Sequence, residues 1–413
     1  MAYLKEQHEL KQYKLLTNQS NYRLSEKGEA YMLRKMIIIL RNTTAILLGS
    51  ICFMSCIYDY NPKDKDLAGL NEPEVVVDGD IIVGGITKVA LNLTKTLGGV
   101  TEELPSGITV NVESENGNIV YGVLVDEVRN VFEIDTRDLD VGGRYRLYIA
   151  IPDRGEYVSE FKQVMVSPPI DEITWSMADD GTYVNVEVTT HNSSPGKLYC
   201  KWNFIENWES HVVYTPFAEY TPQLGKLRNL TWEETLERKY CWSEASSTDI
   251  CITNTEKLSE NIISRYVLRR ITQTDTRVSG LYSITVAQKA LDKDAYIYWE
   301  TLQRNMGSTG GIFAAQPTDL RGNIRCETTP EERVIGYVSV TTQTQMRHFI
   351  DWEELKFYKS GCRSFKFEGQ WNEKYTEGYR VFAIDEFSIW WSYHRCVDCR
   401  VYSNSTKPDF WPR

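Results

Sequence analysis

The segment GRYRLYIAIPDRGEYVSEFKQVMV (143–166) decides the fold class of this chain of 413 residues. A β-strand has a period of two, and on that reading two sets of side chains alternate here: Tyr157, Ser159, Phe161, Gln163 and Met165 on one face, and Val158, Glu160, Lys162, Val164 and Val166 on the other. The preceding run RYRLYIAI (144–151) is rich in the β-branched and aromatic residues that favour strands. Two strands joined by a short polar link indicate antiparallel β-structure.

The chain before this segment repeats the same pattern. From Glu74 onward, short β-runs and turn signals follow one another every 8–12 residues or so: VVVDGDIIVGG, VALNLT, GITVNVES, NIVYGVLV and VFEID. Asn116-Gly117-Asn118 and Gly142-Gly143 are typical of hairpin turns, because these residues tolerate positive φ. Seven strands predict an immunoglobulin-like β-sandwich over residues 74–168. The pair Pro168-Pro169 marks its boundary.

The rest of the chain predicts a larger β-rich domain over residues 170–351. Its strand-like runs include TYVNVEVTT, LYCKWNFIENW, YVLRRITQ, LYSITVAQ, VIGYVSVTT and MRHFID. One prominent helix is expected over 287–306, where Ala295, Trp299 and Leu302 recur at helical spacing. Residues 352–413 form an aromatic, cysteine-containing C-terminal region with a strand pair at YRVFAID and FSIWWSYH. The fold class is therefore mainly β.

Composition argues against one class of partner. The chain holds 11 Trp, 25 Tyr and 13 Phe, which suits pleated, half-buried faces. The net charge is −11, whereas nucleic-acid binding requires a clustered basic face. We therefore expect no nucleic-acid partner. Residues 1–55 differ from the rest in being basic.

These first 55 residues are expected to be a leader. A basic stretch from Met32 to Arg41 precedes the apolar run AILLGSICFM (45–54), and Ser55-Cys56 follows. This order is typical of a lipoprotein signal peptide, in which the thiol of Cys56 receives the lipid. The alternatives are a membrane span over 36–54 and a signal cleaved without lipid. The start codon is expected at Met32 or Met36, which would leave 1–31 untranslated.

Residues 56–73 are then a tether to the membrane. Asp59, Asp64 and Asp66 lie close to the predicted lipid. Such an acidic patch resembles the signal that sends lipoproteins to the cell surface in some Gram-negative bacteria. An ordinary solvated linker is the alternative interpretation.

Seven cysteines remain after the leader and the lipidated residue, and export favours disulfides. Cys241 and Cys251 lie on two β-runs joined by a polar turn, so a hairpin-closing bridge between them is expected. One pair is expected among Cys362, Cys396 and Cys399. A zinc or redox site at Cys396–Cys399 is the alternative, but a second CxxC pair is lacking. The odd count leaves at least one thiol free.

Catalytic motifs are not found. The chain has no HExxH, no G-x-S-x-G and no Walker glycine loop. We therefore predict no catalytic, cofactor-binding or metal-binding residue and no cofactor. A surface hydrolase of glycan or peptide is the alternative, because two of the many carboxylates could converge at long range. A structural adhesin would show extended repeats, which are lacking.

The mature chain resembles a known family over residues 56–413. The segments that carry the resemblance are GRYRLYIAIPDRGEYVSE, LYSITVAQKALDKDAYIYWETLQ, GGIFAAQPTDLRGNI and the tail CVDCRVYSNSTKPDFWP. They resemble the family called domain of unknown function 4249. The resemblance implies an outer-membrane lipoprotein of Gram-negative bacteria, encoded beside a TonB-dependent receptor and acting as its accessory subunit. It supplies no catalytic residues.

The expected function is therefore attachment and binding rather than catalysis. Lipid on Cys56 attaches a surface-exposed protein to the outer membrane, beside a barrel receptor that imports nutrients. Aromatic side chains anchor many protein interfaces, and rings of this kind also bind peptide or glycan ligands. The predicted contact residues all lie in the C-terminal region: Trp371, Tyr375, Tyr379, Trp390, Trp391 and Tyr393.

Overall fold

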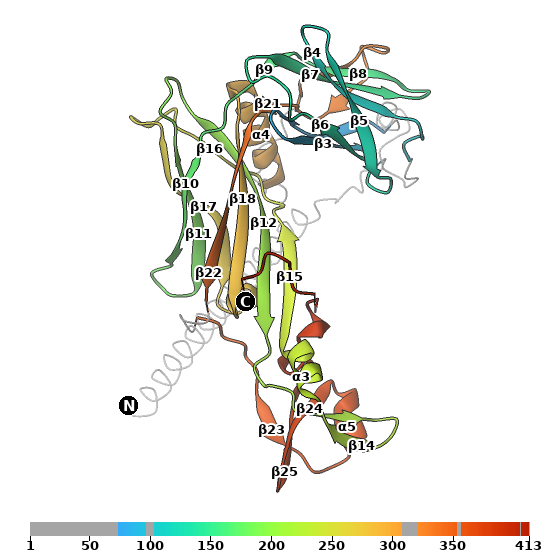
Figure 1. Ribbon diagram of the computed structural model, residues 1–413, viewed down its shortest axis with the longest axis vertical. Helices are drawn as coiled ribbons and strands as arrows, with labels where there is room; N and C mark the ends of the chain where they lie inside the picture. Colours follow the sequence, from blue (N-terminus) through green and yellow to red (C-terminus); the bar gives the residue numbers. More distant parts are fainter. Residues whose placement is uncertain (1–72, 96–102, 308–319, 353–356, 405, 413) are drawn as a thin grey trace, which may run out of the picture. The chain divides into compact units, whose positions relative to one another are not determined.

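The computed structural model describes residues 73–95, 103–307, 320–352, 357–404 and 406–412 (Figure 1). The predicted leader, the lipidated Cys56 and the tether up to residue 72 lie outside these residues. No helix among the described residues is long and apolar enough to cross a membrane. The mainly β fold class is confirmed.

The first sandwich has an immunoglobulin-like strand order. One sheet contains β1 (Val75–Gly79), β3 (Ile86–Leu93) and β6 (Val131–Asp135). The facing sheet contains, in order, β5 (Ile119–Asp126), β4 (Thr109–Ser114), β7 (Arg144–Ile151) and β8 (Gly155–Ser159). β5 pairs with both β4 and β6, so the hydrogen bonding continues from one sheet to the other. β9 (Lys162–Gln163) pairs with β7, and β2 (Ile81–Ile82) follows β1.

A single apolar core lies between these sheets. Alternate residues of each strand point into it, among them Leu91, Phe132, Leu147 and Tyr157. The alternation read from the sequence therefore corresponds to an inner and an outer face. Burial of these side chains stabilises the sandwich at about 25 cal/mol for each Å² of apolar surface.

The second domain repeats the strand order of the first. Its smaller sheet contains β10 (Ile170–Met177), β11 (Tyr183–His191) and β17 (Ile262–Thr272). The facing sheet contains β15 (Tyr240–Ser246), β16 (Cys251–Asn254), β12 (Tyr199–His211), β18 (Leu281–Ala290) and β22 (Gln343–Asp351). Trp202 stacks on Tyr266 between the two sheets, with 4.8 Å between ring centroids. Long insertions separate the strands, and this hides the repeat in the sequence.

Residues 320–341 return to the first sandwich. β19 (Ile324–Cys326) pairs with β8, β20 (Val334–Ile335) pairs with β1, and β21 (Val340–Thr341) pairs with β2. The expectation that VIGYVSVTT lies in the sheet of the second domain is wrong, because its strands pair with β1 and β2 of the first sandwich. The open edges of β1 and β8 offer unpaired backbone groups, and the return segment satisfies them. Val334, Val338 and Val340 complete the first core.

The prominent helix α4 spans Lys293–Gly307 and begins later than the predicted 287. Ala287 and Ala290 instead extend β18, which has β12 on one side and β22 on the other. The side chain of Asp292 accepts a hydrogen bond from the backbone N–H of Ala295, at 2.7 Å. This bond satisfies one of the free donors at the start of the helix.

The C-terminal region is built with an insertion from the second domain. The insertion supplies β13 (Ala218–Thr221), β14 (Lys226–Asn229) and α3 (Trp232–Lys239). The C-terminal part adds β23 (Ser364–Lys366), α5 (Trp371–Thr376), β24 (Tyr379–Asp385) and β25 (Ser388–Tyr393). The strand pair predicted in this region is therefore confirmed. Short 3₁₀ helices span Thr276–Val278, His394–Cys396 and Cys399–Val401.

Substitution of Gly336 tests whether the return segment packs closely against β1. The φ of this glycine is +143°, and a Cβ at this position would collide with the backbone oxygen of Val77 in β1. Gly336→Ala should therefore lower the free energy of unfolding by about 3 kcal/mol or more. Gly84→Ala is the matched control, because Gly84 also has a positive φ of +82° but has open space around it. It should cost only about 1 kcal/mol. Equal losses in urea unfolding would contradict this account.

Candidate functional site

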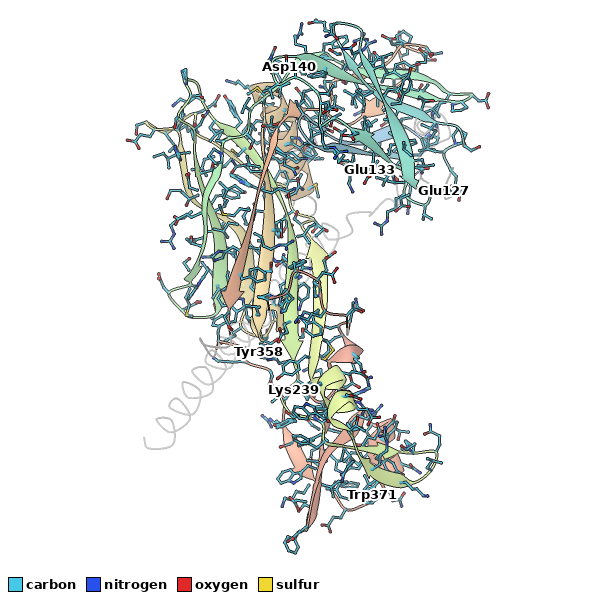
Figure 2. All side chains as sticks on the ribbon, in the orientation of Figure 1. Glu127, Glu133, Asp140, Lys239, Tyr358 and Trp371 are labelled. Atoms are coloured by element: carbon cyan, nitrogen blue, oxygen red, sulfur yellow. A yellow bond between two sulfur atoms is a disulfide. The ribbon has the colours of Figure 1, made fainter. Side chains whose placement is uncertain are left out.

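The six aromatic residues predicted as partner contacts do not form one exposed surface. Trp391 is 0% exposed and packs at the centre of a third core with Tyr220 and Phe367. Trp371, labelled in Figure 2, packs edge-on against Tyr220 with 5.4 Å between ring centroids. Trp391 is therefore withdrawn as a contact residue, because a small subdomain needs its largest rings for its core.

The remaining candidates are more accessible, and their contact role stays a prediction. Tyr375 and Tyr379 are half-buried around the third core. Trp390 is half-buried, and its indole N–H donates to Asp385 at 2.8 Å. Tyr393 is 49% exposed and stacks on Tyr379.

The disulfides join Cys241 to Cys399 and Cys362 to Cys396. The pair expected in the C-terminal cluster is thus Cys362–Cys396, and both cysteines of the CxxC sequence form structural bridges to other positions. The expected bridge between Cys241 and Cys251 is wrong. Both residues face β12, but Cys241 lies opposite Ser210 and Cys251 opposite Trp202. Eight residues of strand separate those positions by about 26 Å.

An exposed apolar face lies on β5 of the first sandwich. We define the β5 face as the outward side chains of this strand, Ile119, Tyr121, Val123 and Val125, together with Val128 in the following turn. Tyr121 is 68% exposed, Val123 65% and Val128 93%. Glu127 in the hairpin turn and Glu133 on β6 locate this hairpin in Figure 2.

The rim of the β5 face is polar. Glu113 of β4, directly opposite Ile119, forms an ion pair of 2.8 Å with Arg146 of β7. On the other side, Val123 lies opposite Glu133, which pairs with Lys88 at 2.7 Å. An apolar strip inside a charged rim is the usual anatomy of a protein interface. Sequence reasoning missed it, although a signal was present: IVYGVLV is apolar on both faces, whereas only one face of this strand meets the core.

A cleft of about 660 Å³ lies between the two sandwiches. One wall comes from the first sandwich, around β1, β2 and the turn at Gly84-Gly85. The other comes from the outer face of β12, β18 and β22, which lie side by side in the second (Figure 1). That outer face is polar, because its side chains there are Lys201, Asn203, Lys289, Gln343 and Gln345.

Asp80 links the walls of this cleft. Its carboxylate accepts a hydrogen bond of 2.8 Å from Lys289 Nζ and one of 3.2 Å from the backbone N–H of Ser339. Lys201 Nζ lies 3.9 Å from the same carboxylate and 3.1 Å from the centre of the Trp299 ring. Lys201 Nζ donates no hydrogen bond to any other residue that the structure describes.

Asp80 and the two lysines differ in how well the charge of each is compensated by its neighbours. Burial alone would raise the pKa of Asp80, but the ammonium groups of Lys289 and Lys201 hold it well below its usual range. Burial lowers the pKa of Lys201 from its ordinary 10.5 to about 8, against the attraction of Asp80 and with added repulsion from Lys289. Asp80 is thus ionised and already bonded to Lys289, while Lys201 is a desolvated second cation.

No group of three or more His, Cys, Asp or Glu among the described residues is arranged to hold a metal ion. Two of the histidines contact a carboxylate within 3 Å, His191 with Asp171 and His211 with Glu209. His191 lies on β11 and His211 at the end of β12. The lysine pair of the cleft is a different kind of arrangement, in which two largely buried ammonium groups lie within 4 Å of the Asp80 carboxylate.

These observations define a protein of two immunoglobulin-like sandwiches with a polar cleft between them. The chain belongs to the family that shares the domain of unknown function DUF4249, whose model matches residues 57–347. The predicted family is thereby confirmed, although the tail that contributed to the resemblance lies beyond the matched residues.

Other comparisons add little. No curated protein matches the chain. Among solved structures, it has been aligned with a DUF4785 family protein from Legionella pneumophila, with 12% sequence identity and a TM-score of 0.18. The alignment covers 52% of each chain, so this protein spans about half the length of that relative. A score this low supports no argument about fold or function.

The lysine pair predicts opposite effects for two equivalent substitutions. Lys289→Met should lower the free energy of unfolding by about 3–5 kcal/mol, because buried Asp80 loses its directly bonded partner. Lys201→Met should leave stability unchanged or raise it, because it removes a desolvated charge. Urea unfolding of both variants at pH 7 measures the contrast. Equal destabilisation would show that both lysines are structural partners of Asp80.

The pKa of Lys201 also predicts how stability depends on pH. Folded Lys201 releases its proton near pH 8, whereas the unfolded chain retains it until about 10.5. Between these values the unfolded state binds more protons, so raising the pH favours the folded state. The free energy of unfolding of the wild type should therefore rise relative to that of Lys201→Met from pH 8 to pH 10. A constant difference would contradict the lowered pKa.

Proposed function

We propose that this protein is a lipoprotein of the outer membrane, exposed at the cell surface, that serves as a non-catalytic binding or accessory subunit of a TonB-dependent receptor in nutrient import. The order of basic stretch, apolar run and Cys56 supports the lipid anchor. What the family resemblance implies supports the receptor. The observation that carries the proposal is the β5 face.

The β5 face has the chemistry of a surface that a partner covers. All five side chains of the β5 face are exposed, as is Leu124 of the same strand, whereas an antiparallel sandwich normally alternates apolar inner with polar outer residues. Exposed apolar side chains gathered in this way usually mark interaction sites. Tyr121 supplies a large ring with a polar tip, the kind of side chain that anchors interfaces.

The tether gives this surface access to a partner in the same membrane. The first strand begins at Val75, and the chain between Cys56 and that strand extends to at most about 60 Å. An anchored protein is confined to this distance from the bilayer. Confinement raises the effective concentration of any membrane partner, so a modest interface area is sufficient for stable association.

A pull-down from mild-detergent extracts of native membranes tests the receptor. Tagged wild-type protein should recover a barrel receptor in stoichiometric amount, measured by quantitative mass spectrometry. Val123→Lys should lower the recovery by roughly tenfold or more, because the ammonium is desolvated in the contact. Its melting temperature should stay within error, because Val123 is exposed.

Leu224→Lys is the matched control for that pull-down. Leu224 is as exposed as Tyr121, at 68%, but it lies in the turn between β13 and β14. This variant should recover the receptor like the wild type. Recovery without any barrel receptor would reject the accessory role, and equal recovery with Val123→Lys would move the contact to another surface.

The lipid anchor is tested separately. Cys56→Ser should prevent lipidation and shift the protein from the membrane fraction to the soluble fraction. Intact-mass measurement of the wild type should show acyl chains on an N-terminal Cys56. A wild-type protein that begins elsewhere, or that carries no lipid, would reject the anchor while leaving the β5 face to be judged by the pull-down.

A further inference from the structure

The cleft contains two lysines that face each other across a strand pair. Lys201 of β12 and Lys289 of β18 are direct partners in the antiparallel register. Like charges in this position repel, and both side chains are largely buried, with 9% and 15% of their surface exposed. Among the residues that the structure describes, Asp80 supplies the only carboxylate that contacts both ammonium groups.

Lys201 is not needed to neutralise Asp80. Lys289 alone neutralises Asp80 through a direct hydrogen bond, and Ser339 satisfies the other carboxylate oxygen. Lys201 is too far from Asp80 for a hydrogen bond, and its ammonium is held against the face of Trp299. A methionine would fill the same volume without the cost of desolvating a charge. Residues kept at such a cost commonly serve a binding or chemical role.

Lys201 also faces open space that a ligand can enter. It lines the cleft together with Asn203, Gln343 and Gln345, whose amide groups both donate and accept hydrogen bonds. Asp78 lines the same cleft from β1 and is exposed, and its carboxylate forms no ion pair or hydrogen bond with another described residue. The cleft therefore presents one desolvated cation surrounded by groups that bind hydroxyls.

We propose that this cleft binds a small polyhydroxylated monocarboxylate, such as a hexuronate, with the ligand carboxylate on Lys201 Nζ. The carboxylate would accept the charge-assisted hydrogen bond that Lys201 lacks. Asp78 and the three amide side chains are the partners for the ligand's hydroxyls. The proposal does not depend on the β5 face or on a receptor.

The charges around Lys201 select a monoanion over a dianion. Asp78 and Asp80 both lie near the ammonium and repel a second negative charge on the ligand. The cleft also lacks an arginine, whose planar fork is the usual partner of phosphate. Inorganic phosphate is therefore expected to bind weakly. A neutral sugar lacks the group that Lys201 needs.

Isothermal titration of the purified full-length protein in detergent at pH 7 tests the site with galacturonate and galactose. The two sugars share their ring hydroxyls and differ in the carboxylate. Galacturonate should bind with a Kd in the millimolar range or below, and galactose should bind roughly tenfold or more weakly. Excess inorganic phosphate should not compete.

Substitution then assigns the binding to Lys201. Lys201→Met should bind galacturonate no better than galactose, with a melting temperature at or above that of the wild type. Lys293→Met, which removes an exposed lysine paired with Glu256 outside the cleft, should bind like the wild type. Equal affinity for the two sugars, undiminished binding by Lys201→Met, competition by phosphate, or no heat at millimolar galacturonate would overturn the proposal.

The pH dependence supplies a second readout. Burial holds the pKa of Lys201 at about 8, and the charged groups that face it are Asp78, Asp80, Lys88 and Lys289. Galacturonate affinity should fall by roughly tenfold for each pH unit above the pKa that Lys201 has in the free protein, until the higher pKa that the bound carboxylate gives it in the complex is reached. Affinity that does not change up to pH 10 would show that the lysine ammonium is not the partner of the carboxylate.

Discussion

One buried carboxylate joins three separate pieces of this chain. Asp80 follows the first strand, its bonded lysine lies on β18 of the second sandwich, and its backbone donor Ser339 lies on the return segment. A buried charge is costly unless each of its lone pairs has a partner, so all three pieces must be in place together. Asp80 therefore ties the two sandwiches and the return segment together at the cleft that it lines.

The local pattern of the sequence predicted the first sandwich well. Alternating residues and Gly-containing turns are short-range signals, so each of the eight strands from Val75 to Ser159 overlaps one of the seven predicted β-runs. The return segment could not, because Val334 and Val340 pair with strands more than 200 residues earlier. Nothing within reach of a local window distinguishes a strand that completes its own sheet from one that completes another. The same limit explains the misplaced start of α4, where β18 continues under tertiary pairing.

The candidate sites follow the same rule: features set by neighbouring residues could be found in the sequence, and those set by contacts between distant residues could not. Aromatic rings such as Trp391 indicated a contact surface, yet a subdomain assembled from two distant segments used them as its core. The β5 face had a local signal, an apolar run without alternation, that was interpreted only as a strand. The lysine pair of the cleft had none, because Lys201 and Lys289 become neighbours only through the register of β12 and β18. The failure of the expected Cys241–Cys251 bridge has the same cause. The two cysteines lie opposite distant positions of β12, and their spacing in the sequence does not show this.

The return segment also sets the order in which the protein can be completed. During synthesis the first eight strands emerge early, but β1 and β8 keep open edges until residues 324–341 have followed. A nascent chain that has already made an entire sandwich therefore still exposes unpaired strand edges while most of the second domain is being added. Open edges of this kind pair readily with other chains. The first sandwich therefore cannot complete its sheet edges before residues 324–341 are made, and the two sandwiches, although each has its own core, are completed together.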